Sequence, residues 1–412
     1  MACIRSLRAR LAVCTLMMVL APWVWAAALS EATHRKLTEI HNQLAEEQYS
    51  AAVQALEQLM ASVSGDGYAT AVVAQTLGYA HLGLERPDAA IAAFETAIAQ
   101  EQLPAQPTAN LLYTLAQLHL AEQRPERALK YLDRWFALLA SVPQELAPPT
   151  PEGHLLHASI LLQLKQTSAA ATAAARAIDL KEDPPASWYQ LLLACHFEHK
   201  DYPAAVDVLK RMLLRWPDDP RYWRQLASLY LALEQDQAAL ATYFVAQNQN
   251  MLEGDSDFLN LVRLAVHTGV PERGARVLQE ALVTGAVAST PEHWELLGNA
   301  WYQAKELGPA IAAFARAAEQ GKDGRLYLRI ARLEYQQGHW AEAAQAAGQA
   351  LGTERFGDRG QAHLLIGLAR YELGEFDAAK AALLQAAGFA ATKARAEQWL
   401  SHLERTRSER AS

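Results

Sequence analysis

The chain has 412 residues, with 37 Lys and Arg against 45 Asp and Glu and a formal net charge of −8. Half of it is hydrophobic (51%), yet aromatic residues make up only 8%, so much of the apolar content is alanine. This composition favours closely packed helices over β-sheet, which prefers branched and aromatic side chains. The acidic balance excludes a general nucleic-acid-binding protein, because such proteins draw affinity from clustered Lys and Arg. Three cysteines exclude a disulfide-stabilised scaffold.

Residues 1–28 have the three-part layout of a secretory signal peptide. Three arginines are followed by an apolar run over residues 11–20 and then by small residues, so that cleavage after Ala26 or after Ala28 fits. This layout predicts export to the periplasm. The alternative is an uncleaved inner-membrane anchor, because residues 11–29 are nearly long enough to span a bilayer. No later segment approaches 18 uninterrupted apolar residues, so we expect membrane contact only through this segment or through partners.

A repeated pattern occupies the rest of the chain, and its clearest copy is a set of large and small residues at fixed spacing: Trp294, Leu297, Gly298, Trp301, Ala310, Phe314 and Ala317. It resembles the tetratricopeptide repeat (TPR) pattern W-x2-L-G-x2-Y followed by A-x3-F. The same frame recurs from Trp223 to Ala246 and, more weakly, from Leu77 to Ala97. The resemblance implies pairs of antiparallel helices.

The residue at the Ala310 position can be followed through the chain, and it is small in ten copies that lie 33 to 42 residues apart: Ala52, Ala90, Ala128, Ala170, Ala205, Ala239, Gly274, Ala310, Ala343 and Ala379. Two helices can approach closely only where no bulky side chain intervenes. We therefore predict an all-α fold, a right-handed α-solenoid of about ten TPR helical hairpins with a C-terminal capping helix.

Proline positions support the same helix boundaries. Proline costs nothing in the first turn of a helix, where its missing N–H has no partner. Five prolines fall at the expected start of the second helix of a hairpin: Pro87, Pro125, Pro203, Pro271 and Pro309.

The expected organisation has five parts. The signal peptide spans residues 1–28 and the first three repeats span 29–140. A proline-rich linker follows at 141–153, where four prolines cannot continue a helix. Repeats four to ten span 154–391. Residues 392–412 form the capping helix, which covers the end of the array, and a basic tail.

By resemblance to the TPR family, the first helices of the hairpins line a concave groove, with groove-facing residues at the second, fifth, ninth and twelfth positions. This frame gives the candidate residues Arg221, Arg224, Arg263, Asn299, Tyr302, Arg325, Arg332, Tyr335 and Tyr371. Arg and Tyr often anchor interfaces, so we expect a protein or peptide partner, an extended or helical segment with some acidic character. The competing interpretation is that these arginines pair with neighbouring acids such as Glu292, Glu295 and Glu334.

The sequence offers little sign of catalysis. It contains no glycine-rich phosphate loop and no H-E-x-x-H, C-x-x-C or G-x-S-x-G motif. We expect no enzyme, no cofactor and no metal. The alternative from another class is an enzyme with a dispersed metal site near His196, Glu198 and His199, in which the two imidazoles lie three residues apart on one helix face. The competing interpretation is a polar helix end.

A narrower resemblance involves three segments, residues 323–329, 361–367 and 396–400. These are similar to exported bacterial TPR proteins associated with TonB-type energy-transduction systems. The resemblance implies a periplasmic accessory of a TonB-like envelope complex, with partners such as inner-membrane energy-transduction components. An alternative within the same class is an assembly factor for outer-membrane proteins or exopolysaccharide export.

Expression of the full chain in a Gram-negative host tests the predicted export. We expect the mature protein to begin at Ala27 or Leu29, because small residues stand where the signal peptidase needs them. Intact-mass measurement of the purified protein checks this, and Ala26→Gln with Ala28→Gln should block processing. Recovery of the full-length chain in the inner-membrane fraction would favour the uncleaved anchor.

Overall fold

The computed structural model describes residues 29–354 and 356–411, and within these ranges every regular element is an α-helix. The predicted signal peptide lies outside the described residues. Helices of the described ranges follow one another as ten pairs, and a last helix remains unpaired. This confirms the predicted all-α solenoid of about ten hairpins. No helix of the described residues is both long and apolar enough to cross a membrane.

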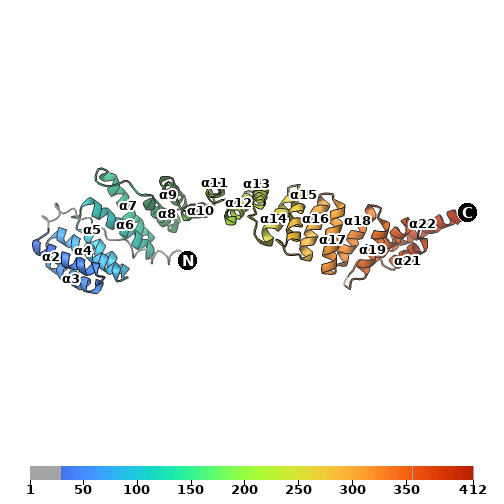
Figure 1. Ribbon diagram of the computed structural model, residues 1–412, viewed down its shortest axis with the longest axis horizontal. Helices are drawn as coiled ribbons and strands as arrows, with labels where there is room; N and C mark the ends of the chain where they lie inside the picture. Colours follow the sequence, from blue (N-terminus) through green and yellow to red (C-terminus); the bar gives the residue numbers. More distant parts are fainter. Residues whose placement is uncertain (1–28, 355, 412) are drawn as a thin grey trace. The chain divides into compact units, whose positions relative to one another are not determined.

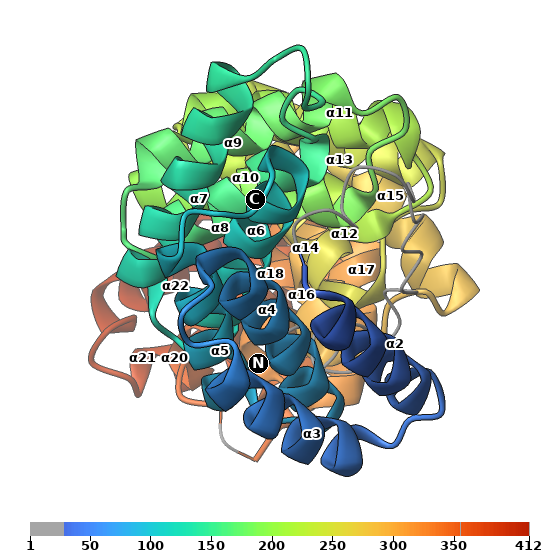
Figure 2. The same ribbon diagram turned by 90° about the vertical axis from the view of Figure 1, so that its left-hand side faces the viewer.

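The chain divides into two compact units, Met1–Val208 and Leu209–Ser412, and the boundary falls within one helix, α11. The helices of the first unit can be followed from the blue end of the chain in both views (Figure 1, Figure 2). They are α2 (Glu31–Ala45), α3 (Tyr49–Ser62), α4 (Gly67–Gly83), α5 (Pro87–Ala99), α6 (Ala105–Ala121), α7 (Pro125–Ser141), α8 (Pro151–Gln163), α9 (Thr167–Leu180), α10 (Ala186–His199) and α11 (Tyr202–Arg215).

The second unit begins within α11 and continues with five further hairpins and the final helix. Its helices are α12 (Pro220–Ala232), α13 (Asp236–Asn248), α14 (Gly254–His267), α15 (Pro271–Thr284), α16 (Pro291–Gln303), α17 (Leu307–Gly321), α18 (Gly324–Gln336), α19 (Trp340–Leu351), α20 (Arg359–Glu372), α21 (Phe376–Ala387) and α22 (Lys393–Ala411).

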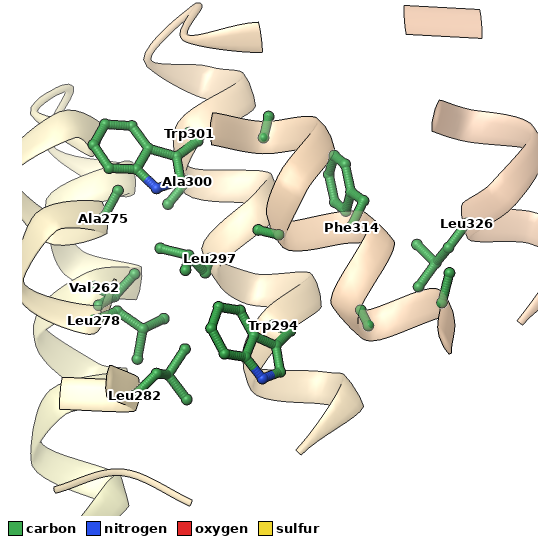
Figure 3. Close-up of a cluster of buried hydrophobic side chains, with 14 of the residues drawn as sticks. Val262, Ala275, Leu278, Leu282, Trp294, Leu297, Ala300, Trp301, Phe314 and Leu326 are labelled. Atoms are coloured by element: carbon green, nitrogen blue, oxygen red, sulfur yellow. The ribbon is translucent and has the colours of Figure 1, made fainter. Parts of the chain in front are cut away.

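The small residues predicted at the helix crossings are buried as expected. All nine alanines of the set have no exposed surface, and Gly274 is buried as well. Gly298 in α16 lies against Phe314 in α17 so closely that a methyl group at Gly298 would stand 2.5 Å from Cδ1 of that ring. Figure 3 shows Phe314 between neighbouring helices, with Trp294 and Trp301 packed on the other side of α16. Close approach at these crossings therefore sets the hairpin geometry.

Each hairpin turn ends its first helix in the same way. In all ten pairs the turn contains one residue with positive φ, from Glu47 to Gly374, and seven of these residues are not glycine. The backbone N–H of the residue immediately before the second helix bonds back to the carbonyl five residues earlier, as Arg124 does to His119 at 2.8 Å and Glu306 does to Trp301 at 3.0 Å. This bond satisfies a carbonyl that the helix end leaves free.

The five prolines predicted at helix starts all lie in the first turn of a helix. Pro87, Pro125 and Pro271 occupy the first position of α5, α7 and α15, while Pro203 and Pro309 lie within the first turns of α11 and α17. The missing proline N–H costs no helical hydrogen bond at any of these positions. The predicted helix boundaries are therefore confirmed at all five prolines.

The proline-rich connection is shorter than the predicted range of 141–153. Ser141 ends α7, and Pro151 already begins α8 because the Thr150 side chain accepts a hydrogen bond from the Gly153 N–H at 3.1 Å. Leu146 lies buried in the hydrophobic cluster that contains Trp135. Trp135 stands at the position that Ala97 and Ala317 occupy in other hairpins. Its larger side chain lies against Gly153, where a methyl group would stand 2.6 Å from the ring, so the absence of a side chain at Gly153 makes room for the tryptophan.

The last helix closes the second unit as predicted. Ala396 and Leu403 of α22 are fully buried and pack with residues of α20 and α21, Leu383 among them. Two ion pairs hold its outer face, Lys380 with Glu404 at 3.1 Å and Arg407 with Asp377 at 2.8 Å. The helix covers apolar surface that a further hairpin would otherwise bury.

A matched pair of glycines tests the importance of close helix approach. Gly298→Ala should lower the free energy of unfolding by about 1–2 kcal/mol, because the methyl group forces Phe314 to move and only part of this cost is offset by better helix propensity. Gly308→Ala in α17 is the control, since no atom lies within 4 Å of its added methyl group. It should stabilise by about 0.5–1 kcal/mol. Urea unfolding measures both, and equal shifts would contradict the packing argument.

Most of the histidines whose pKa is lowered by burial lie in the first unit. Six of its histidines have their pKa lowered from 6.5 chiefly by burial: His41, His81, His119, His154, His157 and His196. His119 is fully buried and stacks on Tyr131, and its Nε2 lies 3.4 Å from Glu95 Oε1 without hydrogen-bond geometry. Arg124 and Arg127 lower its pKa further, while Glu95 opposes them.

This arrangement predicts acid sensitivity of the first unit. The unfolded chain protonates His119 at a higher pH than the folded chain does, so the stability that the neutral ring contributes is complete above about pH 6.5 and is lost as pH falls through the folded pKa. His119→Gln keeps a polar side chain, like Gln43 at the equivalent position of the first hairpin, but cannot take a proton. Proton uptake on unfolding between pH 7 and 5 should fall by up to about one proton. An unchanged pH dependence of the urea midpoint would contradict this account.

Candidate partner-binding surface

The candidate residues lie on one face of the first helices. With Pro291 counted as position 1, the second, fifth, ninth and twelfth positions of α16 are Glu292, Glu295, Asn299 and Tyr302, which are exposed or partly exposed. The opposite face of α16, including Trp294 and Leu297, is buried. This division follows from the 3.6-residue helical period. Equivalent positions on α12, α14 and α18 make up, with those of α16, the surface that we call the first-helix surface.

Two of the candidate arginines are held by their own helix caps. Arg221 and Arg325 follow the N-cap residues Asp219 and Asp323 by two positions, and each side chain pairs with its aspartate at 2.6 Å. The same aspartates accept the backbone N–H of these arginines. Hydrogen bonds from the arginine side chains lower the pKa of both aspartates. Both arginines therefore contribute little free positive charge to the surface.

A third arginine, Arg224, also faces acidic residues. Its Nη2 lies 3.3 Å from Glu253 and its Nη1 lies 3.9 Å from Asp257. Asp257 is 3% exposed and accepts the backbone N–H of Glu253 at 3.0 Å. Arg224 compensates a buried carboxylate at the start of α14. Three of the five arginines thus pair with acids, although not with the acids expected from the sequence.

The remaining two candidate arginines are unpaired among the described residues. Arg263 in α14 and Arg332 in α18 are exposed, and neither forms an ion pair with any residue in 29–354 or 356–411. Both occupy the ninth position of their helix, two hairpins apart. Glu334, expected as a partner, instead lies 2.7 Å from Nδ1 of His339.

Between these two arginines the surface carries an ordered polar group around Arg329. Its Nη1 donates to Asn299 Oδ1 at 2.7 Å, and its guanidinium lies 4.1 Å from the Phe314 ring centre and 5.2 Å from that of Tyr302. Burial lowers the pKa of Arg329, while Glu295 and Tyr302 oppose this. Sequence reasoning gave Arg329 no site role, because it stands at the sixth position, outside the expected frame.

The structure brings the aromatic candidates into different surroundings. Tyr302 is 40% exposed. Tyr335 is half-buried against Trp340, with ring centres 4.7 Å apart. The Tyr371 hydroxyl lies 3.0 Å from His402 Nε2 and 3.2 Å from Thr406 Oγ1, both in α22. Tyr371 is therefore engaged by the capping helix, and Tyr302 is the most accessible of the three.

Within each unit, the twelfth position of the first helices is occupied by apolar or aromatic residues, which we call the apolar row. In the second unit this position holds Leu231, Val266, Tyr302, Tyr335 and Tyr371; in the first unit it holds Leu44, Leu82, Leu120, Leu162 and Phe197. None of these side chains is fully buried, and Phe197, Leu231 and Tyr302 are 41%, 39% and 40% exposed. The exposed members, Phe197, Leu231 and Tyr302, are the ones accessible to a partner, whereas Val266 and Tyr335 also pack against the core of the second unit.

The side chains of the alternative metal site have separate partners. His196 occupies the eleventh, core-facing position of its helix, and its Nδ1 lies 3.7 Å from Asp201. His199 Nδ1 lies 3.2 Å from Thr167 Oγ1, and Glu198 lies 3.5 Å from Lys165. Among the described residues no group of three or more His, Cys, Asp or Glu is placed to hold a metal ion. This arrangement fits a polar helix end.

The three segments of the narrower resemblance have packing roles. Asp323 caps α18, Gly367 lies against Leu383 with no room for a methyl group, and Trp399 packs on Tyr371 with ring centres 5.4 Å apart. These roles are needed in any stacked hairpin. The segments therefore contribute no free side chain of their own to the first-helix surface.

Comparison with known proteins agrees with the fold. A family model described as tetratricopeptide repeat matches residues 76–144, 259–325 and 328–394, and a second model with the same description matches residues 185–229. Together these matches span more than half of the chain. No curated protein sequence matches the chain significantly.

Several solved repeat structures are similar in part. A tetratricopeptide repeat protein from Parabacteroides merdae has 12% identity and a TM-score of 0.38 over 74% of this chain and 99% of its own. The C-terminal part of a TPR repeat-containing protein from Cytophaga hutchinsonii has 11% identity and a TM-score of 0.37, covering 69% and 94%. The TPR2AB domain of yeast Sti1, solved in a complex with pHSP90, has 15% identity and a TM-score of 0.31, covering 61% and 96%.

Proposed function

Because the chain belongs to the tetratricopeptide repeat family, whose repeats bind proteins or peptides, we propose that it is a non-enzymatic scaffold that holds a partner polypeptide on its first-helix surface. The observation that carries this proposal is the apolar row at the twelfth position with two unpaired arginines beside it. Leu231 and Tyr302 of this row are 39% and 40% exposed and are available to a partner, whereas Tyr335 also packs on Trp340 of its own hairpin.

The chemistry of this surface suits a polypeptide. Tyrosine supplies a large rigid contact area at low entropic cost, and arginine supplies forked donors for carboxylates. Tyr302 and Arg329 are already fixed against one another, with Asn299 holding the guanidinium. A partner therefore meets side chains whose rotamers are restrained before binding, which reduces the entropy lost on association.

We further propose that the protein works in the periplasm as an accessory of a TonB-like envelope complex. The layout of residues 1–28 supports export. The resemblance of residues 323–329, 361–367 and 396–400 to exported TPR proteins of TonB-type systems supports the complex. In this role the first-helix surface would bind a component of the energy-transduction machinery.

Photocrosslinking in cells tests the proposed function. A benzophenone amino acid at Tyr302 should yield a discrete adduct with a partner, because this side chain is exposed in the middle of the surface. The same group at Val283, a 75% exposed residue on the second helix α15, is the control and should yield none. Mass spectrometry of the adduct identifies the partner and tests the TonB-like role. Equal crosslinking from both positions would contradict a specific surface.

A matched pair of arginines tests the role of charge. Arg332→Ala should reduce affinity for the crosslinked partner about tenfold, as expected for loss of an interface arginine. Arg325→Ala in the same helix makes the identical chemical change, but Arg325 is already paired with Asp323 and should leave affinity unchanged. Binding of the purified components by calorimetry measures both. A larger effect from Arg325 would contradict the assignment.

A further inference from the structure

Glu95 stands at the junction between the second and third hairpins and faces two side chains of the third. Its carboxylate accepts a hydrogen bond from the Tyr131 hydroxyl at 2.8 Å, and its Oε1 also lies 3.4 Å from Nε2 of His119. Glu95 belongs to α5, His119 to α6 and Tyr131 to α7. The bond to Tyr131 therefore joins two second helices, whereas a bond to His119 would join a second helix to a first helix.

His119 has no hydrogen-bond partner in this arrangement. Its side chain has no exposed surface, and neither ring nitrogen forms a hydrogen bond with any of the described residues. The imidazole stacks on the Tyr131 ring, with 5.3 Å between ring centres and 5° between the planes. Buried polar groups are nearly always hydrogen-bonded, so an exception calls for a specific reason. Here the nearest carboxylate is already bound by the tyrosine that stacks on the ring.

The charged and titratable groups that face His119 come from α5, from α7 and from the turn before α7. Burial lowers the pKa of His119 from 6.5, and Glu95 of α5 opposes this effect. Arg127 of α7 and Arg124 of the turn lower the pKa further. Tyr131 does not ionise near neutral pH, because burial and the hydrogen bond to Glu95 raise its pKa to about 12. The imidazole is therefore the side chain that acidification of this junction addresses.

The preceding junction contains the same groups except for the tyrosine. One repeat earlier, the residues that correspond to this histidine, glutamate, arginine and tyrosine are His81, Glu57, Arg86 and Ala93. Burial lowers the pKa of His81, Arg86 adds to this effect, and Glu57 opposes it. A carboxylate faces a buried histidine at both junctions, but a tyrosine hydroxyl competes for it only between the second and third hairpins.

We infer that Glu95 is a proton-controlled switch between the second and third hairpins: its carboxylate binds Tyr131 while His119 is neutral and moves to His119 when that ring takes a proton from the solvent. A protonated imidazole carries an N–H on both nitrogens, so Nε2 becomes a charged donor 3.4 Å from the carboxylate. Charge-assisted hydrogen bonds are about twice as strong as neutral ones. The imidazolium therefore displaces the half-buried phenol, and acid exchanges the link between α5 and α7 for one between α5 and α6.

Titration of the histidine rings by nuclear magnetic resonance, on the purified protein between pH 7.5 and 4.5, tests the switch. Tyr131→Phe keeps the stacked ring and removes the competing hydroxyl, so the midpoint of His119 should rise by about 0.5–1 pH unit. Glu95→Gln removes the carboxylate, and the midpoint should fall by about one unit. In the double variant Tyr131→Phe should no longer raise the midpoint, because the hydroxyl acts only through the carboxylate.

His81 is the internal reference, since its junction lacks the tyrosine, and Glu126→Gln is the control, since this exposed residue of α7 does not face His119. The midpoint of His81 should not move in any variant, and Glu126→Gln should leave that of His119 in place. A midpoint that Tyr131→Phe lowers or leaves unchanged would overturn the switch, as would an equal rise with and without Glu95. Circular dichroism of the same samples shows whether the chain is folded. Unfolding before His119 takes its proton would also overturn the switch, which requires the protonated ring in the folded chain.

Discussion

Close approach of two helices at one small residue per hairpin is the constraint on which the structure depends. With alanine or glycine at the crossing position, such as Ala310, the second helix lies directly on the first. Aromatic side chains such as Phe314 fill the space beside a glycine of the first helix, such as Gly298. This contact uses one face of each first helix completely. The other face is only partly covered: Tyr335 packs on Trp340 of its own hairpin, whereas Tyr302 is 40% exposed and accessible to a partner.

This part of the structure could be predicted from the sequence, because close helix packing requires small residues at fixed positions and these can be read from the sequence. Ten small residues and five first-turn prolines were sufficient to place the hairpins, and both sets have the expected roles. The ten turn residues with positive φ could not be predicted in the same way. Seven of these residues are Glu, Gln or Lys instead of glycine. For each of them the left-handed conformation costs about 1–2 kcal/mol, and the surrounding backbone hydrogen bonds offset this cost.

The candidate site was less predictable, for a reason that lies in the length of the arginine side chain. The position of a residue in the repeat determines on which face of the helix its side chain lies. It does not determine where the charged end of a long arginine side chain points, because that end turns towards the nearest carboxylate. Asp219 and Asp323 precede Arg221 and Arg325 by only two residues, so a cap-bound arginine could have been recognised from the sequence. The contact of Arg329 with Asn299, thirty residues away, could not, because it depends on how two hairpins stack.

Charge on this surface acts locally. The chain as a whole is acidic, so an acidic partner is not attracted from a distance, and at physiological salt charges more than about 8 Å apart are largely screened. In the proposed complex, Arg263 and Arg332 would therefore act only after the apolar row has brought the partner close. At that range each would pair with a carboxylate of the partner, and this pairing would favour one register of the bound segment over its neighbours. Arg221 and Arg325 cannot favour a register in this way, because each is already paired with the aspartate that caps its own helix.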